Sequence, residues 1–185
     1  MLDPGPEDAL TSDHMTGIRI AVTGTPGVGK STFCEQGDWA TITVQELAKQ
    51  HDCIEEVEED GAAPIDVDRL REVVVWPQES CILIDGHLSH LLSVDAAIII
   101  RCEPSILRAR LQSRDYSAQK VEENVECELI GLITAECLEL PHLELDSAEG
   151  VESMIAAVES WITDGFKPQK PSEPIDWIDE IHGED

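Results

Sequence analysis

The residues best suited to chemistry lie in one glycine-rich stretch, Gly24 to Ser31, which reads GTPGVGKS and has the spacing G-x-x-x-x-G-K-S. Glycines at this spacing let successive backbone N–H groups turn toward clustered negative charge. The lysine and the hydroxyl of the motif reach the same charge. We therefore interpret Lys30 as a cation for the β- and γ-phosphates of a nucleoside triphosphate, and Ser31 as a ligand of Mg²⁺.

A second candidate group follows the apolar run 81–84, where Asp85 and His87 stand two residues apart. Magnesium-dependent phosphoryl transfer needs a further acid, typically at the end of a neighbouring buried strand. We interpret Asp85 as that acid, acting on the metal through water, and a turn-forming Asp-Gly pair is the alternative. A neutral His87 could orient or deprotonate a water molecule. A purely structural histidine is the alternative for this residue.

The few basic residues are unevenly distributed. Five of the twelve lie between positions 101 and 120 beside only two acids, so this segment is positive in a chain of net charge −27. A local reversal of sign favours a segment that faces phosphate over an ordinary solvated helix face. Arg110 and Arg114 are the best candidates for the transferred phosphoryl group, followed by Lys120 and Arg108; the fifth basic residue of the segment is Arg101.

Two further observations concern the substrates. Lys49 stands alone among acids at the end of a short helical pattern, where it could hold an acceptor phosphate or be a plain surface lysine. The base-reading pattern N-K-x-D, which usually accompanies GTP specificity, does not occur in the sequence. ATP is therefore the expected donor.

Alternating apolar patterns predict the elements that must position these residues. Parallel α/β sheets place their sites at the carboxyl ends of the strands, where the glycine-rich stretch and Asp85 both fall. The predicted strands are 18–23, 41–44, 81–84, 96–100 and 142–145. The predicted helices begin at Lys30 and at Pro104 and also span 45–50, 64–75, 117–140 and 151–162.

The length of 185 residues suits one domain, which we place at 17–163. Residues 1–16 are rich in Pro, Gly and acids without periodicity, so disorder is expected there. Residues 164–185 form a Pro-rich acidic tail. Both Met1 and Met15 are candidate starts of translation.

Composition restricts the class of protein. Asp and Glu number 39 against 12 Lys and Arg, which resembles the surface of a protein from a salt-accumulating halophile; an ordinary acidic protein is the alternative. So acidic a chain does not favour a nucleic-acid-binding face. The sequence has six cysteines without paired spacing, no apolar run of membrane length and no signal-peptide pattern. These features predict a cytoplasmic protein without membrane contact.

Together the motifs GTPGVGKST, D-G-H after an apolar run, and RxRLxxRDYSxxKxxENVxxE resemble the adenylate kinase isoenzyme 6 family, over about residues 18 to 161. The resemblance implies a P-loop nucleotide kinase fold, an α/β architecture with a five-stranded parallel sheet flanked by helices. It also implies a nucleoside monophosphate (NMP) segment at 41–64 and a short lid at 113–123. The residues that match its ATP site are Gly27, Gly29, Lys30, Ser31, Thr32 and the lid Arg114.

The resemblance implies two functions that the sequence leaves open. One is an adenylate kinase that converts ATP and AMP into two ADP with Mg²⁺, and the other is an ATP-hydrolysing assembly factor. The second would have a small-subunit platform ribosomal protein and pre-rRNA particles as partners. A third hypothesis is that the protein is a P-loop kinase for a different small molecule. The chain departs from the family in reading Arg114-Asp115-Tyr116 for R-G-Y, and in having Ser147 to Glu149 near the place of a lysine.

Overall fold

The computed structural model describes residues 17–56, 63–76, 81–114 and 116–182. The predicted disorder of residues 1–16 lies outside the described residues, as do parts of the NMP segment and Asp115 of the lid.

A five-stranded parallel sheet forms the centre of the described chain, as predicted. Its strands follow the order β2-β3-β1-β4-β5, so the strand that leads into the glycine-rich loop lies in the middle. The strand order reverses its direction at β1, because β3 and β2 lie on one side of it and β4 and β5 on the other. A doubly wound sheet opens a crevice for ligands at such a point. The strands are β1 (Arg19–Thr23), β2 (Ala40–Thr43), β3 (Ile82–Asp85), β4 (Ala96–Arg101) and β5 (His142–Asp146).

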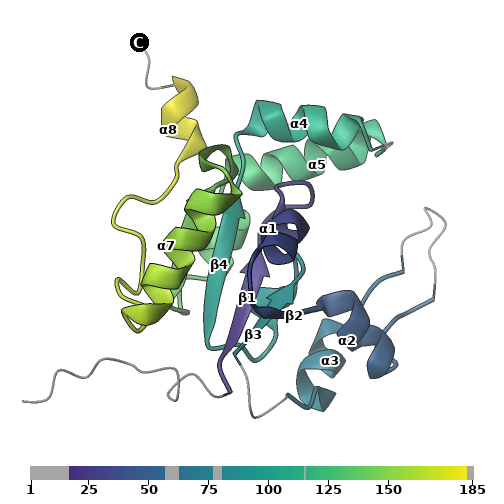
Figure 1. The fold of residues 1–185 in the computed structure, drawn as a ribbon. Coiled ribbons are helices and arrows are strands. Elements are labelled where there is room, and N and C mark those ends of the chain that lie inside the picture. The colour runs from purple at the N-terminus through teal and green to yellow at the C-terminus, as the bar shows by residue number, and fades with distance from the viewer. Residues whose placement is uncertain (1–16, 57–62, 77–80, 115, 183–185) are drawn as a thin grey trace, which may run out of the picture.

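Helices cover both faces of this sheet because its strands are apolar on both sides. Helices α1 (Lys30–Gln36) and α7 (Val151–Thr163) cover one face (Figure 1), where they pack on residues such as Ile20 and Ile98. The opposite face presents Ala21 and Ile99, which pack against Cys137.

The remaining helices surround the site. Helices α2 (Val44–Gln50) and α3 (Val67–Val73) pack beside β2 and β3, and α4 (Pro104–Gln112) lies against α5 (Ala118–Leu129) at the carboxyl end of the sheet (Figure 1). Two 3₁₀ turns, η2 (Ser89–Leu91) and η3 (Ser147–Glu149), follow β3 and β5.

The prediction of one continuous helix over 117–140 is wrong. Helix α5 ends at Leu129, and α6 (Leu132–Glu136) begins after Gly131, whose φ of 63° lies in the left-handed region. This break redirects the chain, so that Ile133 and Cys137 pack on the second face of the sheet. Apolar spacing alone could not reveal the break, because residues on both sides of Gly131 continue to be apolar at helical intervals.

The segment predicted as an acidic tail packs against the domain as far as its last described helix, α8 (Trp177–His182). Figure 1 shows the chain running back along α7 before α8 begins. Phe166 contacts the ring of Trp161 edge-on with centroids 4.9 Å apart, and the Trp161 indole donates to the carbonyl of Pro168. Trp177 is buried, with 3% of its surface exposed. The composition of this segment therefore concealed two aromatic anchors.

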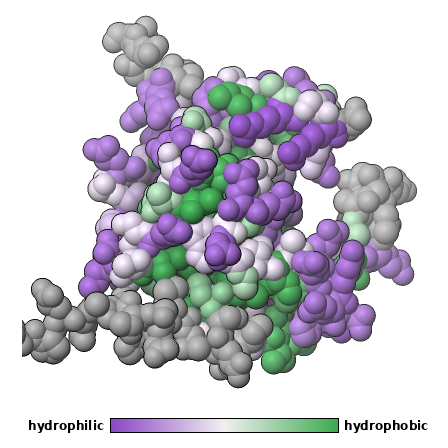
Figure 2. Space-filling view, viewed as in Figure 1, coloured by the Kyte–Doolittle hydropathy of each residue, from purple (hydrophilic) through white to green (hydrophobic). Residues whose placement is uncertain are grey.

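The surface seen in Figure 2 is largely hydrophilic, with hydrophobic residues gathered in patches between hydrophilic ones. None of the helices in the described parts of the chain combines the length and apolarity that a membrane crossing requires. With a net charge of −27, mutual repulsion between surface carboxylates should oppose folding wherever salt does not screen it.

We expect the melting temperature to rise by at least about 5 °C between 0.1 and 2 M KCl, because the Debye length falls from about 10 Å to about 2–3 Å over this range. Circular dichroism during heating at several KCl concentrations measures this. A melting temperature that stays flat would show that the acidic surface does not limit stability.

Candidate active site

The glycine-rich loop leaves the carboxyl end of β1 and leads into α1. Gly24, Gly27 and Gly29 have φ values of 133°, 96° and 116°, which side chains rarely permit. At Gly24 a Cβ atom would also stand 2.3 Å from the carbonyl oxygen of Ile100 in β4, so the loop presses directly on the neighbouring strand. The positive φ values of all three glycines agree with the prediction, and at Gly24 the lack of a side chain also permits close packing against β4.

Lys30 begins α1 and its ammonium lies inside the loop. Its Nζ donates to the carbonyl oxygens of Gly24 at 2.7 Å and Thr25 at 3.0 Å. Burial lowers the pKa of Lys30 to about 8, although the charge of Asp85 acts in the opposite direction. The loop therefore holds a cation that has already lost most of its water, which is how it can interact strongly with an incoming phosphate.

Ser31 and Asp85 meet beside this cation. The Ser31 hydroxyl donates to Asp85 Oδ2 at 2.8 Å, and Asp85 pairs in register with Val22 of β1 and Thr43 of β2. The parallel sheet therefore brings these two distant residues together, as predicted. Their oxygen atoms are the hard donors that Mg²⁺ prefers, and the small number of protein ligands suits an ion that keeps several waters. The residues present thus fit the predicted metal site.

The two histidines after Asp85 differ in position. His87 is exposed on the cavity wall, yet nearby protein atoms and the positive charge of Lys30 lower its pKa. Its imidazole is therefore neutral at pH 7. His90 is buried and fixed, with Nδ1 at 2.8 Å from the Thr23 hydroxyl and Nε2 at 2.9 Å from Glu136. His87 faces the site, whereas His90 links β1 to α6.

The predicted arginines lie at different parts of the site. Arg110 lines a cavity of about 320 Å³ beside Gly29 and Thr32, and its guanidinium donates to the Val28 carbonyl at 3.2 Å. Arg114 lines this cavity and also a second one of about 400 Å³, which holds Lys30, Ser31, Asp85 and His87. The structure thus brings Arg114 to both cavities, and it places Arg110 with the first cavity only.

Other predicted cations lie elsewhere. Lys49 is exposed in the last turn of α2 and lines none of these cavities, because the first turn of α2 is the part that faces the site. Arg108 forms an ion pair with Glu122 on the surface. Arg101 is buried between Glu128 and Glu144. The positive segment 101–120 therefore faces the cavities only in part, because Arg101 and Arg108 have carboxylate partners instead.

A third cavity, of about 680 Å³, extends the second. The two share walls at Pro26, His87 and Tyr116, and the third is lined largely by apolar groups such as Leu88 and Ile133. Lys120 also lines it and lies 5.5 Å from the centre of the Tyr116 ring. The site is therefore a series of three adjoining cavities with the phosphate loop at its centre.

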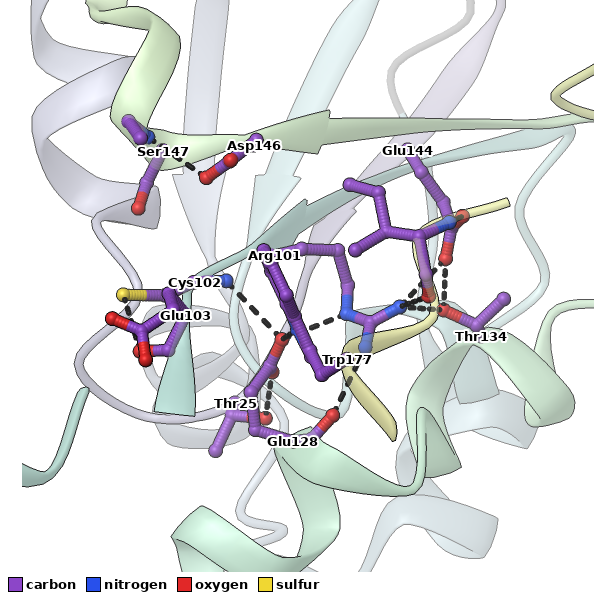
Figure 3. A network of polar contacts seen from close by, with 12 residues as sticks. Thr25, Arg101, Cys102, Glu103, Glu128, Thr134, Glu144, Asp146, Ser147 and Trp177 are labelled. Carbon is purple, nitrogen blue, oxygen red and sulfur yellow. Dashed lines mark hydrogen bonds and ion pairs between the residues drawn. The ribbon is translucent and has the colours of Figure 1, made fainter. Parts of the chain in front are cut away.

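Sequence reasoning gave no role to Glu128, the last residue of the third motif. This carboxylate accepts a hydrogen bond from Thr25 of the phosphate loop at 2.6 Å (Figure 3). Its position was a signal that it is buried, because it lies seven residues after Val121 and three after Val125, on the apolar side of α5. A buried acid needs partners, and this spacing could have prompted a search for them.

The sheet order, the loop after its central strand and the acid on the adjacent strand define the class of P-loop kinases. Among solved structures, a gluconokinase from Sinorhizobium meliloti shares this fold with a TM-score of 0.51 and 14% identity, over 85% of this chain and 99% of that one. Residues 20–131 also match the family described as AAA domain.

Sequence relatives specify the family. A protein of Archaeoglobus fulgidus named "Putative adenylate kinase" is 41% identical over 170 residues, which cover 88% of this chain and 93% of that protein. The "Adenylate kinase isoenzyme 6 homolog FAP7" of Saccharomyces cerevisiae is 30% identical over 161 residues, 78% of this chain and 82% of that protein. The chain belongs to the adenylate kinase isoenzyme 6 family, as its motifs predicted.

The lowered pKa of Lys30 predicts proton uptake on binding of a nucleoside triphosphate. The pKa of Lys30 is about 8 in the free protein, and the negative charge of bound phosphate must raise it. At a pH between these two pKa values, the lysine therefore takes up as much as one proton on binding. Above pH 8 the affinity should fall, by at most about tenfold per pH unit. Calorimetry at pH 8.5 in buffers of different ionisation enthalpy measures the uptake.

The matched variant is Lys30→Arg, which keeps the positive charge but cannot release a proton in this range. Its binding should show no uptake at pH 8.5. Equal uptake in both proteins would assign the proton to another group.

Proposed function

We propose that the protein transfers the γ-phosphoryl group of ATP to a nucleoside monophosphate, with AMP as the expected acceptor. The observation that carries this proposal is the pair of cavities that meet at Gly27 and Arg114. An enzyme with two nucleotide substrates needs two spaces that open on one set of phosphate-binding groups.

The donor nucleotide fits the cavity of about 320 Å³. Arg110 offers a planar cation there, the kind of group that stacks on an aromatic base, and Val151 and Met154 supply apolar contact. From this cavity the triphosphate can follow the loop past Gly29 toward Lys30. This assigns Arg110 to nucleotide binding, whereas the sequence had placed it at the transferred phosphoryl group.

The acceptor fits the other two cavities. Its phosphate would lie near Asp85 and Arg114 in the cavity of about 400 Å³, and its base in the larger apolar one. Asn124 lies on the wall of that larger cavity; its Nδ2 donates one hydrogen to the Lys120 carbonyl, which leaves a second hydrogen and the amide oxygen for the edge of a base. Lys49 has no part in this arrangement.

The reaction is an in-line displacement. A phosphate oxygen of AMP forms a bond to the γ-phosphorus while the bond to the β–γ bridging oxygen breaks, and its electron pair stays on the departing ADP. Lys30 and Arg114 stabilise the charge on the transferred group. Mg²⁺ held by Ser31, with Asp85 acting through water, would neutralise the β- and γ-phosphate oxygens. The acceptor phosphate is already ionised, so the step needs no base.

A second function, ATP hydrolysis, is favoured by His87. A water nucleophile must lose a proton when it attacks the γ-phosphorus, and a neutral imidazole on the cavity wall can accept it. An assembly factor that couples hydrolysis to a small-subunit ribosomal protein and pre-rRNA particles would use this activity. Those partners stay predictions that rest on the family resemblance.

Two alanine variants separate these functions. Arg114→Ala should lower both ADP formation from ATP with AMP and hydrolysis of ATP alone, each by at least about 10²-fold, because both pass through the same charged phosphoryl group. His87→Ala should lower hydrolysis at least about tenfold more than transfer, because only water needs a base. Both rates are measured in molar KCl with excess Mg²⁺.

Arg108→Ala is the matched control, since Arg108 lies on α4, shortly before Arg114 in the chain, but pairs with Glu122 outside the cavities. It should keep both rates within about twofold, as expected of a surface ion pair. Equal losses of transfer and hydrolysis in His87→Ala would leave that histidine structural. Undetectable transfer with AMP in the unmodified protein would overturn the kinase proposal.

A further inference from the structure

Glu128 sits at the centre of a buried polar network that joins the phosphate loop to the end of the chain. Only 2% of its surface is exposed. Its Oε1 accepts from Arg101 Nε at 2.7 Å and from the backbone N–H of Cys102 at 3.1 Å, while Oε2 accepts from the hydroxyl of Thr25 at 2.6 Å. Both carboxylate oxygens are therefore held by donors from the phosphate loop and from the end of β4.

The C-terminal segment supplies a fourth donor. The indole of Trp177, the first residue of α8, donates to Glu128 Oε1 at 3.0 Å, and its ring lies 5.8 Å from the guanidinium carbon of Arg101. In Figure 3 the Arg101 guanidinium lies between Glu128 on one side and Glu144 with Thr134 on the other. The last described helix is therefore part of the network that holds the loop.

Backbone contacts fix the approach to Trp177. The N–H of Ile175 donates to Glu144 Oε2 at 2.8 Å, and its carbonyl accepts from Arg101 Nη1 at 3.1 Å. Further back, the N–H of His142 donates to the carbonyl of Gln169 at 2.9 Å. The segment is thus attached at several points before it reaches Glu128.

At the other end of the network, Thr25 contacts Lys30 through its backbone. The carbonyls of Gly24 and Thr25 accept the two hydrogen bonds of the lysine ammonium. A shift of the Thr25 side chain would move the peptide that carries one of these carbonyls. The charge of Glu128 also acts on Lys30, since it raises the pKa of that lysine against the effect of burial.

We propose that Glu128 is a positioning residue for the phosphate loop, and that Trp177 of the C-terminal segment keeps it in place. A buried carboxylate that loses one donor has to reorient or attract water, and Thr25 is the partner through which that change reaches the loop. This inference rests on the proposed function where it concerns catalysis. Its structural part, the coupling of Trp177 to the loop, does not depend on which reaction occurs.

Trp177→Phe tests the coupling, because it removes the indole donor while keeping an aromatic ring. The matched control is Trp161→Phe, where the lost indole hydrogen bond also ends on the C-terminal segment, at Pro168, but does not involve Glu128. Hydrogen exchange followed by mass spectrometry in molar KCl reports the opening of loop amides without any ligand.

In Trp177→Phe, exchange of the amides between Gly24 and Lys30 should become about threefold to tenfold faster, the size expected for one lost hydrogen bond. Trp161→Phe should leave these amides within about twofold of the unmodified protein, even if its melting temperature falls as much. Equal acceleration in both variants, or none in Trp177→Phe, would overturn the proposal.

A double-mutant cycle gives a second readout. Thr25→Val removes the hydroxyl donor, and its effect on ATP affinity should be non-additive with that of Trp177→Phe and additive with that of Trp161→Phe. Additivity in both pairs would contradict a shared route through Glu128. If loop exchange responds as expected but the unmodified protein does not bind ATP, the coupling stands and the proposed function fails.

Discussion

The buried ammonium of Lys30 is the constraint on which the rest of the structure depends. A cation withdrawn from water is costly unless it is compensated: two loop carbonyls accept its hydrogen bonds, and the nearby charge of Asp85 raises its pKa against the effect of burial. The glycine conformations bring those carbonyls into place, and the parallel register of β3 with β1 brings Asp85 to the end of the sheet where the loop begins. The same desolvation prepares the site for phosphate, because an incoming anion meets a cation whose water has already been removed.

A chain of net charge −27 has few cations, and they differ in their surroundings. Some lie at the cavities, as Lys30, Arg110 and Arg114 do. Arg101 instead sits between the buried carboxylates Glu128 and Glu144, which would be untenable without it. Near the site, the buried acids Glu128 and Glu144 thus share one buried cation.

The sheet, the phosphate loop and the meeting of Ser31 with Asp85 could be predicted from sequence because each has a local signal: apolar runs, glycine spacing, an acid after a strand. The break at Gly131 was missed because apolar spacing continues across it, although the glycine itself was a possible signal. Trp177 was concealed in a segment whose composition suggested an acidic tail, because composition does not show where one buried aromatic residue docks. Arg101 and Arg108 were misread for a related reason: charge density along the chain does not reveal which cations already have partners.

Glu128 shows why a role can be missed even when the residue stands inside a matched motif. The loop motif describes groups that touch phosphate, and Glu128 touches none; it acts on Thr25, more than 100 positions away in the chain. A loop built from glycines gains binding geometry at the expense of rigidity, because glycine restricts the backbone least. Rigidity must then come from outside the loop, through Ile100 pressing on Gly24 and through the carboxylate that holds Thr25. The docked C-terminal segment closes that carboxylate off from water, and burial without water is what lets one hydrogen bond fix the position of the loop.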